Sequence, residues 1–209
     1  ALADRSVTDF AHVAASEAPA PGGGSVAAAV GALGAAMGTM VANLSAHKRG
    51  WDDRWEHFSA WAERGQACVG RLLALIDEDT RAFDAVLEAY RMPKETEADL
   101  ARRDAAVEAA TQGAIASPLA VIRASIEAMD VAVAMSGEGL PTSISDAGVG
   151  ALCARAAIRA AALNVRINAP GLKDRAFAEA ALAEADAAMA AAEAREAEAL
   201  RQVLATIDA

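Results

Sequence analysis

The chain has 209 residues, of which 55% are hydrophobic, 23% charged and 4% aromatic. This size and composition fit one globular domain over residues 1–209 and exclude a disordered chain. The net charge of -10 at pH 7 argues against nucleic acid as a partner. Alanine, the best helix former, recurs in nearly every segment, so the composition favours packed helices over a sheet.

Start and stop signals divide the chain into about seven helices, which predicts an all-α bundle of long, mostly antiparallel helices. Ser6 with Asp9 forms a capping pair, and Ser117-Pro118 has the cap-then-proline order that starts a helix. We expect the helices at about residues 6–16, 25–46, 52–90, 96–116, 117–137, 143–168 and from 174 to the C-terminus.

The segment Ala18-Pro-Ala-Pro-Gly-Gly-Gly-Ser25 cannot be helical, and it leads into the second helix. The backbone N–H groups of Gly22, Gly23 and Gly24 would lie free at the positive end of the helix dipole. Such a site can bind a carboxylate or phosphate, or let a flat ring approach the backbone. The alternative is a flexible connector that is capped by Ser25.

The second helix is uncharged from residue 26 to residue 44 and is long enough to span a bilayer. It consists mostly of alanine and glycine, however, so we expect a buried bundle helix and no membrane partner. Gly31, Gly34 and Gly38 share one face, where another backbone can approach closely.

Polar residues close this helix. Lys48 and Arg49 would suit the anionic tail of a ligand, although they also simply complement the negative helix end. Asn43, one turn earlier, would be costly to bury without a hydrogen-bond partner.

Acidic residues interrupt the apolar face of the third helix. Asp79 and Phe83 lie four residues apart and share a face. A carboxyl group that packs against an aromatic ring would have a raised pKa, as a general acid or base needs near neutral pH. Acidic residues that form surface salt bridges with Arg81 are the alternative.

The helix at 143–168 carries polar residues at both ends. Asp146 is either the third member of a capping box with Ser143 or an acid beside small residues that leave room for a ligand. Asn164 and Asn168 lie one turn apart, and neutral amides can bind the donor and acceptor edge of a heterocycle.

The two cysteines and three histidines show no metal-ligand spacing, so no metal site is expected. Two distant thiols fit a reduced, cytoplasmic protein. A first residue other than methionine suggests a processed terminus or an excised domain.

Five segments together resemble the formiminotransferase-cyclodeaminase / methenyltetrahydrofolate cyclohydrolase family. They are PAPGGGSVAA, MVANLSAHKRGWDDRW, DEDTRAFDAV, SISDAGVGAL and AALNVRINAPGLKDRAF. The resemblance covers almost the whole chain and is greatest to the cyclodeaminase half of the bacterial bifunctional enzymes. It implies an all-helical homodimer that acts on tetrahydrofolate derivatives, without another cofactor.

The resemblance implies conversion of 5-formiminotetrahydrofolate to 5,10-methenyltetrahydrofolate and ammonia. Two alternatives remain: a cyclohydrolase that opens the methenyl compound to 10-formyltetrahydrofolate, and a non-catalytic folate-binding helical module. In the family context, Asp146 and Asp79 are expected to transfer protons. The expected folate-binding residues are Gly22, Gly23, Gly24, Ser25, Asn43, Asn164 and Asn168, with Lys48 and Arg49 at the carboxylates of a polyglutamate tail. A formimidoyltransferase domain is a further candidate partner.

Overall fold

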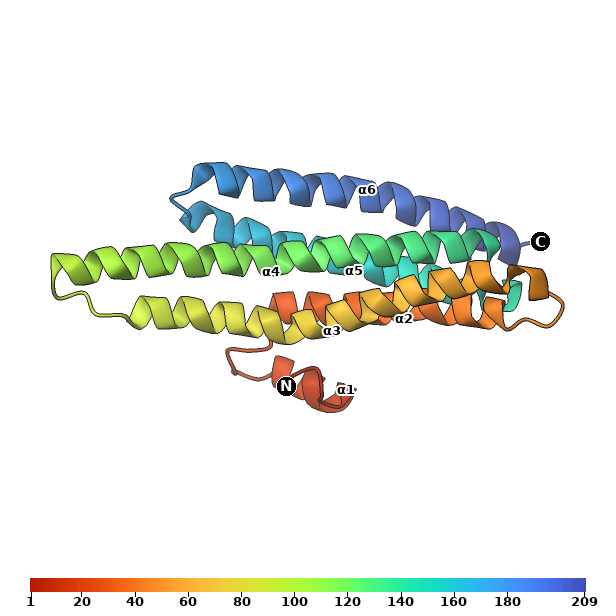
Figure 1. Ribbon diagram of the computed structural model, residues 1–209, viewed down its shortest axis with the longest axis horizontal. Coiled ribbons are helices and arrows are strands. Elements are labelled where there is room, and N and C mark those ends of the chain that lie inside the picture. The colour runs from red at the N-terminus through yellow and green to blue at the C-terminus, as the bar shows by residue number, and fades with distance from the viewer.

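The computed structural model describes residues 1–209 and contains six α-helices and no strand. The all-α prediction is confirmed, although the helices number six rather than about seven. They are α1 (Val7–Ala14), α2 (Gly23–Ala46), α3 (Trp55–Arg91), α4 (Glu97–Glu138), α5 (Ile144–Asn168) and α6 (Arg175–Ile207), with short 3-10 turns at Asp52–Arg54, Pro141–Ser143 and Ala169–Gly171. The long helices α2 to α6 run nearly parallel or antiparallel to one another, and α1 lies outside the bundle (Figure 1).

The predicted break at Ser117-Pro118 is wrong, because α4 runs uninterrupted through this point with Pro118 inside it. An interior proline loses one backbone hydrogen bond and costs a helix about 3 kcal/mol or more. α4 contacts α2, α3, α5 and α6, and Pro118 is fully buried. Burial against four helices therefore outweighs the local preference for a break.

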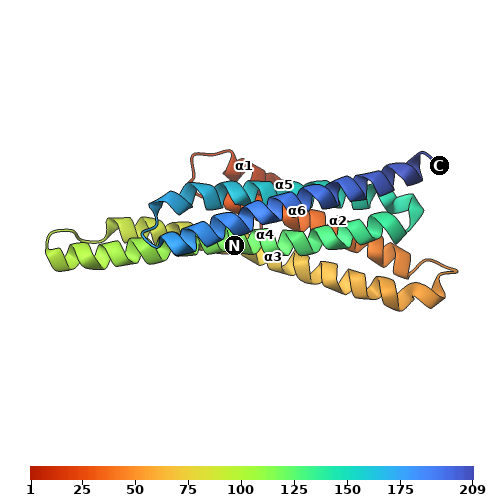
Figure 2. The same ribbon diagram turned by 90° about the horizontal axis from the view of Figure 1, so that it is seen from above.

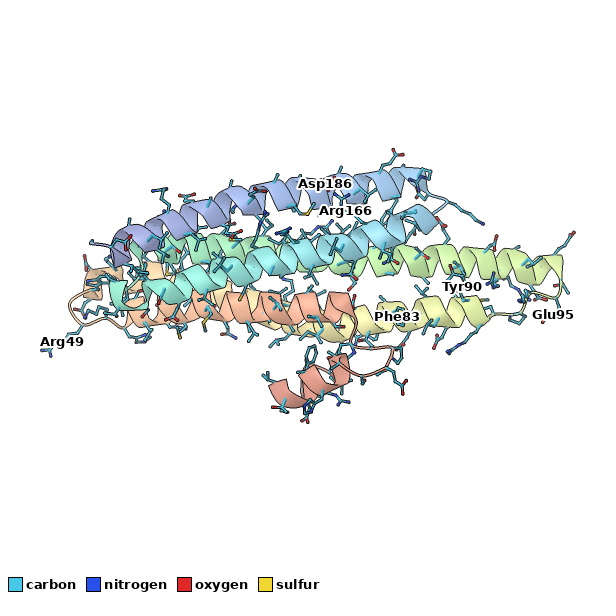
Figure 3. All side chains as sticks on the ribbon, turned by 180° about the vertical axis from the view of Figure 1, so that it is seen from behind. Arg49, Phe83, Tyr90, Glu95, Arg166 and Asp186 are labelled. Atoms are coloured by element: carbon cyan, nitrogen blue, oxygen red, sulfur yellow. The ribbon has the colours of Figure 1, made fainter.

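α2 packs against α3, α4 and α5. It runs side by side with α5, and both helices face the viewer in Figure 3. A Cβ atom on Gly34 would lie 2.9 Å from the Gly150 carbonyl oxygen, so the two backbones meet where neither has a side chain. This confirms the prediction that the glycine face of the second helix admits another backbone.

Buried alanines from all five long helices make up much of the core. By length and composition alone, Gly23–Ala46 and Pro141–Gly171 could each cross a membrane. Within these two segments, however, 61% and 50% of the most apolar stretch is buried inside the bundle, as in core helices of other folds.

α3 and α4 form the longest pair, and their connected ends extend beyond the other helices in both side and top views (Figures 1 and 2). α2 begins, and α5 ends, beside the base of this extension. The start of α2 and the end of α5 therefore meet interior parts of α3 and α4 at one place.

Candidate functional site

A pocket of about 310 Å³ lies where these four helices meet. It is lined by the loop before α2, one face of α3, one residue of α4 and the last turns of α5. The lining residues are Pro19, Ala20, Gly22, Gly23, Gly24, Asp79, Thr80, Phe83, Val86, Ala114, Asn164, Ile167 and Asn168. Four segments that are far apart in the sequence thus contribute to one cavity.

The glycine segment forms the start of α2 and one wall of the pocket. Gly22 occupies the cap position without any side-chain cap, so the first N–H groups of the helix have no such partner. A Cβ atom on Gly24 would lie 2.1 Å from Asp79 Oδ1, so any side chain at this position would displace the Asp79 carboxyl group. Glycine lets this carboxyl group from α3 occupy the space that a side chain would take.

Ser25 is not the cap that the connector interpretation assumed. It lies inside α2, fully buried, because the helix begins at Gly23. Its Oγ atom lies 2.9 Å from the Ile76 carbonyl oxygen and 3.0 Å from Asp79 Oδ2. Ser25 therefore stands behind the pocket and orients the Asp79 carboxyl group rather than contacting a ligand.

Asp79 is the acidic side chain of the pocket. Burial raises its pKa above the ordinary value, and this effect outweighs the hydrogen bonds from the Ser25 side chain and backbone, which lower it. Phe83, one turn further along α3, lines the same cavity, as the sequence predicted. A carboxyl group with a raised pKa holds a proton more readily than an ordinary one, so Asp79 has the properties of a proton-transfer group.

Asn164 and Asn168 line the opposite wall, at the end of α5. Their Nδ2 groups donate to backbone carbonyls: Asn164 to Ala160 at 3.0 Å, and Asn168 to Asn164 at 2.9 Å and to Ala114 at 3.4 Å. Because the amide nitrogens are engaged, the two Oδ1 atoms remain as acceptors. This wall can therefore accept hydrogen bonds from the N–H groups of a heterocycle.

The other predicted site residues lie at the opposite end of the same chain. Asn43 is 20 residues from Gly23 along α2, which is about 30 Å at 1.5 Å per residue. Lys48 and Arg49 follow α2, are exposed and form no ion pair. Figure 3 shows Arg49 at one end of the molecule and Phe83 well towards the other.

Asp146 is equally distant, since 18 residues of α5, or about 27 Å, separate it from Asn164. The capping-box interpretation of this residue is wrong, because Ser143 makes no side-chain cap hydrogen bond. Ser143 belongs to a 3-10 turn with φ -116° and ψ 12°, instead of the extended backbone that a capping serine adopts. One pocket within one chain therefore does not contain both predicted carboxylates.

The sequence did not predict the apolar residues that line the pocket, namely Val86, Ala114 and Ile167. One sequence feature could have indicated Ala114, because Pro118 follows it by four residues. Proline inside a helix has no N–H group, so the carbonyl oxygen four residues before it lacks its helical hydrogen bond.

The fold and pocket define an all-α helical bundle with a half-buried acid in the wall of its cavity. The family model for formiminotransferase-cyclodeaminase matches residues 6–187, and the chain belongs to this family. It is therefore an all-α enzyme of folate one-carbon metabolism.

This chain is similar to relatives that differ from one another in activity. Methenyltetrahydrofolate cyclohydrolase of Methylorubrum extorquens is 41% identical over 181 residues, which are 87% of each chain. Formimidoyltransferase-cyclodeaminase of Mus musculus is 33% identical over 178 residues, but the match spans only 33% of that longer protein. The crystal structure of formiminotetrahydrofolate cyclodeaminase from Thermotoga maritima has a TM-score of 0.88 and 25% identity, covering 99% of this chain and 100% of that one.

Proposed function

We propose that this protein is a methenyltetrahydrofolate cyclohydrolase, which adds water to 5,10-methenyltetrahydrofolate and releases 10-formyltetrahydrofolate. The main support for acid–base chemistry is that the half-buried carboxyl group of Asp79 lines the pocket and has a raised pKa. The 41% identity over 87% of both chains favours the cyclohydrolase reaction over the cyclodeaminase reaction that the segments first suggested.

Asp79 would act twice in this reaction. As ionised carboxylate it faces the cationic methenyl bridge and takes a proton from the attacking water while the new C–O bond forms. It then returns this proton to nitrogen 5 as the C–N5 bond breaks. The second proton of the water is released when the hydroxyl oxygen becomes the formyl carbonyl, so one water enters and one proton leaves.

The pocket walls would hold the two nitrogens in place during these steps. The amide oxygens of Asn164 and Asn168 accept from the N–H edge of the pterin, and the N–H groups of Gly23 and Gly24 donate to its oxygen or to the tetrahedral intermediate. No side chain protrudes from the glycines, so a flat ring can lie against the backbone.

A second candidate function is the cyclodeaminase, favoured by the Thermotoga structure that covers the whole chain. In that reaction nitrogen 10 attacks the carbon of the protonated formimino group, and ammonia leaves the tetrahedral carbon between the same two nitrogens. Asp79 would take the proton from nitrogen 10 and give it to the departing ammonia.

The experiment compares kcat/KM of the purified protein for 5,10-methenyltetrahydrofolate hydrolysis and for ammonia release from 5-formiminotetrahydrofolate. We expect the first to exceed the second and to exceed the uncatalysed rate by several orders of magnitude. A higher kcat/KM for the formimino substrate would overturn the cyclohydrolase in favour of the cyclodeaminase. Tight binding of both folates without turnover would mark the chain as a non-catalytic binding module.

We further propose a homodimer through the shared outer face of α2 and α5. Large apolar side chains lie exposed along both helices, with exposed fractions of 60% for Leu33, 68% for Leu163 and 78% for Ile167. An interface between two copies would remove this exposed apolar surface from water. Ile167 belongs both to this face and to the pocket lining, so a second copy would border the pocket.

A two-fold pairing with antiparallel α2 helices would also explain the distant residues. It brings the end of one copy that carries Asn43, Lys48, Arg49 and Asp146 towards the pocket of the other copy. Each site would then combine Asp79 of one subunit with Asp146 of the second, and the two exposed cations would meet the polyglutamate tail. We propose the dimer face on α2 and α5, the binding of a polyglutamate tail and a cytoplasmic location together.

A further inference from the structure

Pro118 occupies the middle of α4 although every local rule disfavours it there. It is fully buried and lies four residues after Ala114, the one residue of α4 that lines the pocket. Because proline has no N–H, the Ala114 carbonyl oxygen receives no hydrogen bond from position 118, and the ring tilts this carbonyl away from the helix axis.

The Ala114 carbonyl does have another partner. Asn168 Nδ2, from the last turn of α5, lies 3.4 Å from it and donates to it. The same nitrogen lies 2.9 Å from the Asn164 carbonyl oxygen. The two hydrogens of the Asn168 amide are therefore both used, one within α5 and one across to α4.

This pairing decides which atom the pocket presents. If the Asn168 amide turned over, its oxygen would face two carbonyl oxygens, so the two donors hold the amide in one orientation. Oδ1 then remains free as a hydrogen-bond acceptor. With the Asn164 contact alone, the side chain would lose its second anchor and could rotate.

We infer that Pro118 is a positioning residue: it frees the Ala114 carbonyl, which fixes Asn168 so that its amide oxygen accepts from the substrate. The inference rests on the proposed function for its kinetic readout, but the contact itself exists without substrate. The proline destabilises α4 locally, and the benefit is a pocket wall with a defined acceptor.

The test uses Pro118→Ala in the full chain. Alanine restores the N–H group and the helical bond to Ala114, so we expect an unchanged or higher melting temperature. At the same time KM for 5,10-methenyltetrahydrofolate should rise roughly 3- to 10-fold, as for one lost hydrogen bond, with kcat little changed. Ser117→Ala is the matched control: Ser117 is the buried neighbour, and its Oγ has no partner, so both parameters should stay at the wild-type values.

A double-mutant cycle with Asn168→Ala then tests the connection. Since both changes interrupt one path, the double variant should be no worse than the more damaging single variant. Losses in KM that multiply, or a wild-type KM in a folded Pro118→Ala protein, would overturn the inference.

A ligand-free measurement separates this inference from the proposed function. NMR should show the two Asn168 side-chain amide protons exchanging slowly with water in the wild-type protein and faster in Pro118→Ala. Equal exchange in both proteins would overturn the positioning role even if the enzyme is active. Slow wild-type exchange in a protein that turns over neither folate would leave the contact standing and reject the catalytic proposal. If Pro118→Ala does not fold, Asn168→Asp replaces it as the test, because aspartate has the same shape but cannot donate a hydrogen bond to the Ala114 carbonyl. This variant should raise KM by at least roughly 3-fold. An unchanged KM would contradict the inference.

Discussion

At the scale of single residues, Asp79 lowers the stability of the folded protein and supplies the proton-transfer group of the proposed reaction. Its carboxyl group is half-buried, its pKa is raised by that burial, and it occupies the space beside Gly24 where a side chain would otherwise be. A group whose pKa is higher in the folded than in the unfolded protein loses its stabilising contribution as pH rises through the folded pKa. The acid is therefore retained at the expense of stability at neutral pH.

We expect Asp79→Asn to lower kcat by roughly 10²- to 10⁴-fold, because asparagine can still accept from Ser25 but cannot carry a proton. Asp77→Asn is the matched control, since Asp77 accepts from the backbone N–H groups of Leu2 and Ala3 at 2.6 and 3.5 Å and does not line the pocket. Turnover of Asp79→Asn near that of Asp77→Asn would remove Asp79 from the mechanism.

The same variant predicts a pH dependence of stability. Below about pH 4, the ordinary pKa of an unfolded aspartate, the Asp79 carboxyl group is neutral in both states. As pH rises through the folded pKa, the wild type loses stability from this group and Asp79→Asn does not. Urea unfolding from pH 4 to pH 8 should show the variant gaining stability relative to the wild type. A constant or declining difference would contradict the raised pKa.

At the scale of elements, the start of α2 and the middle of α3 are fitted to each other. Gly24→Ala would place a Cβ atom 2.1 Å from Asp79 Oδ1, and this carboxyl group can move because it is the end of a side chain. We therefore expect a folded protein in which Asp79 is displaced and kcat drops at least 10-fold, as for a lost proton-transfer geometry.

Gly70→Ala on α3 is the control for Gly24→Ala. A Cβ atom there meets nothing within 4 Å, so alanine should keep full activity and stabilise the helix by about 0.4–1 kcal/mol. Circular dichroism and steady-state kinetics on both variants are sufficient. Wild-type kcat for Gly24→Ala would show that the close contact with Asp79 does not matter for catalysis.

At the scale of the whole molecule, the two polar ends of the α2–α5 pair are separated by most of the length of these two helices. If the proposed dimer joins them, Leu163→Glu should shift the protein to monomers in analytical ultracentrifugation and lower activity with helix content retained. Leu204→Glu is the control, because Leu204 is also exposed, at 56%, but lies on α6. A fully active Leu163→Glu monomer would argue against a shared site.

Subunit complementation gives the sharper test of the shared site. Asp79→Asn and Asp146→Asn homodimers should both be weakly active. In a mixed dimer one site carries both changes and the other carries neither, so co-expression should restore up to about half of the wild-type activity per dimer. No recovery in verified mixed dimers would place Asp146 outside the site.

Local sequence determined the helices and most of the pocket, whereas tertiary contacts decided how they are used. Capping at Ser6, the glycine segment, the shared face of Asp79 and Phe83, and the paired asparagines were predictable because they depend on neighbours within one or two turns. The continuity of α4 through Pro118 was not, since its stability comes from four surrounding helices. Nor was the separation of Asp146 and Asn43 from the pocket, because the chain order does not reveal which helix ends meet. Ser25 shows the same limit: it is a cap by local pattern, but a hydrogen-bond partner of Asp79 once α2 and α3 pack, because only the packed helices bring residues 54 positions apart into contact.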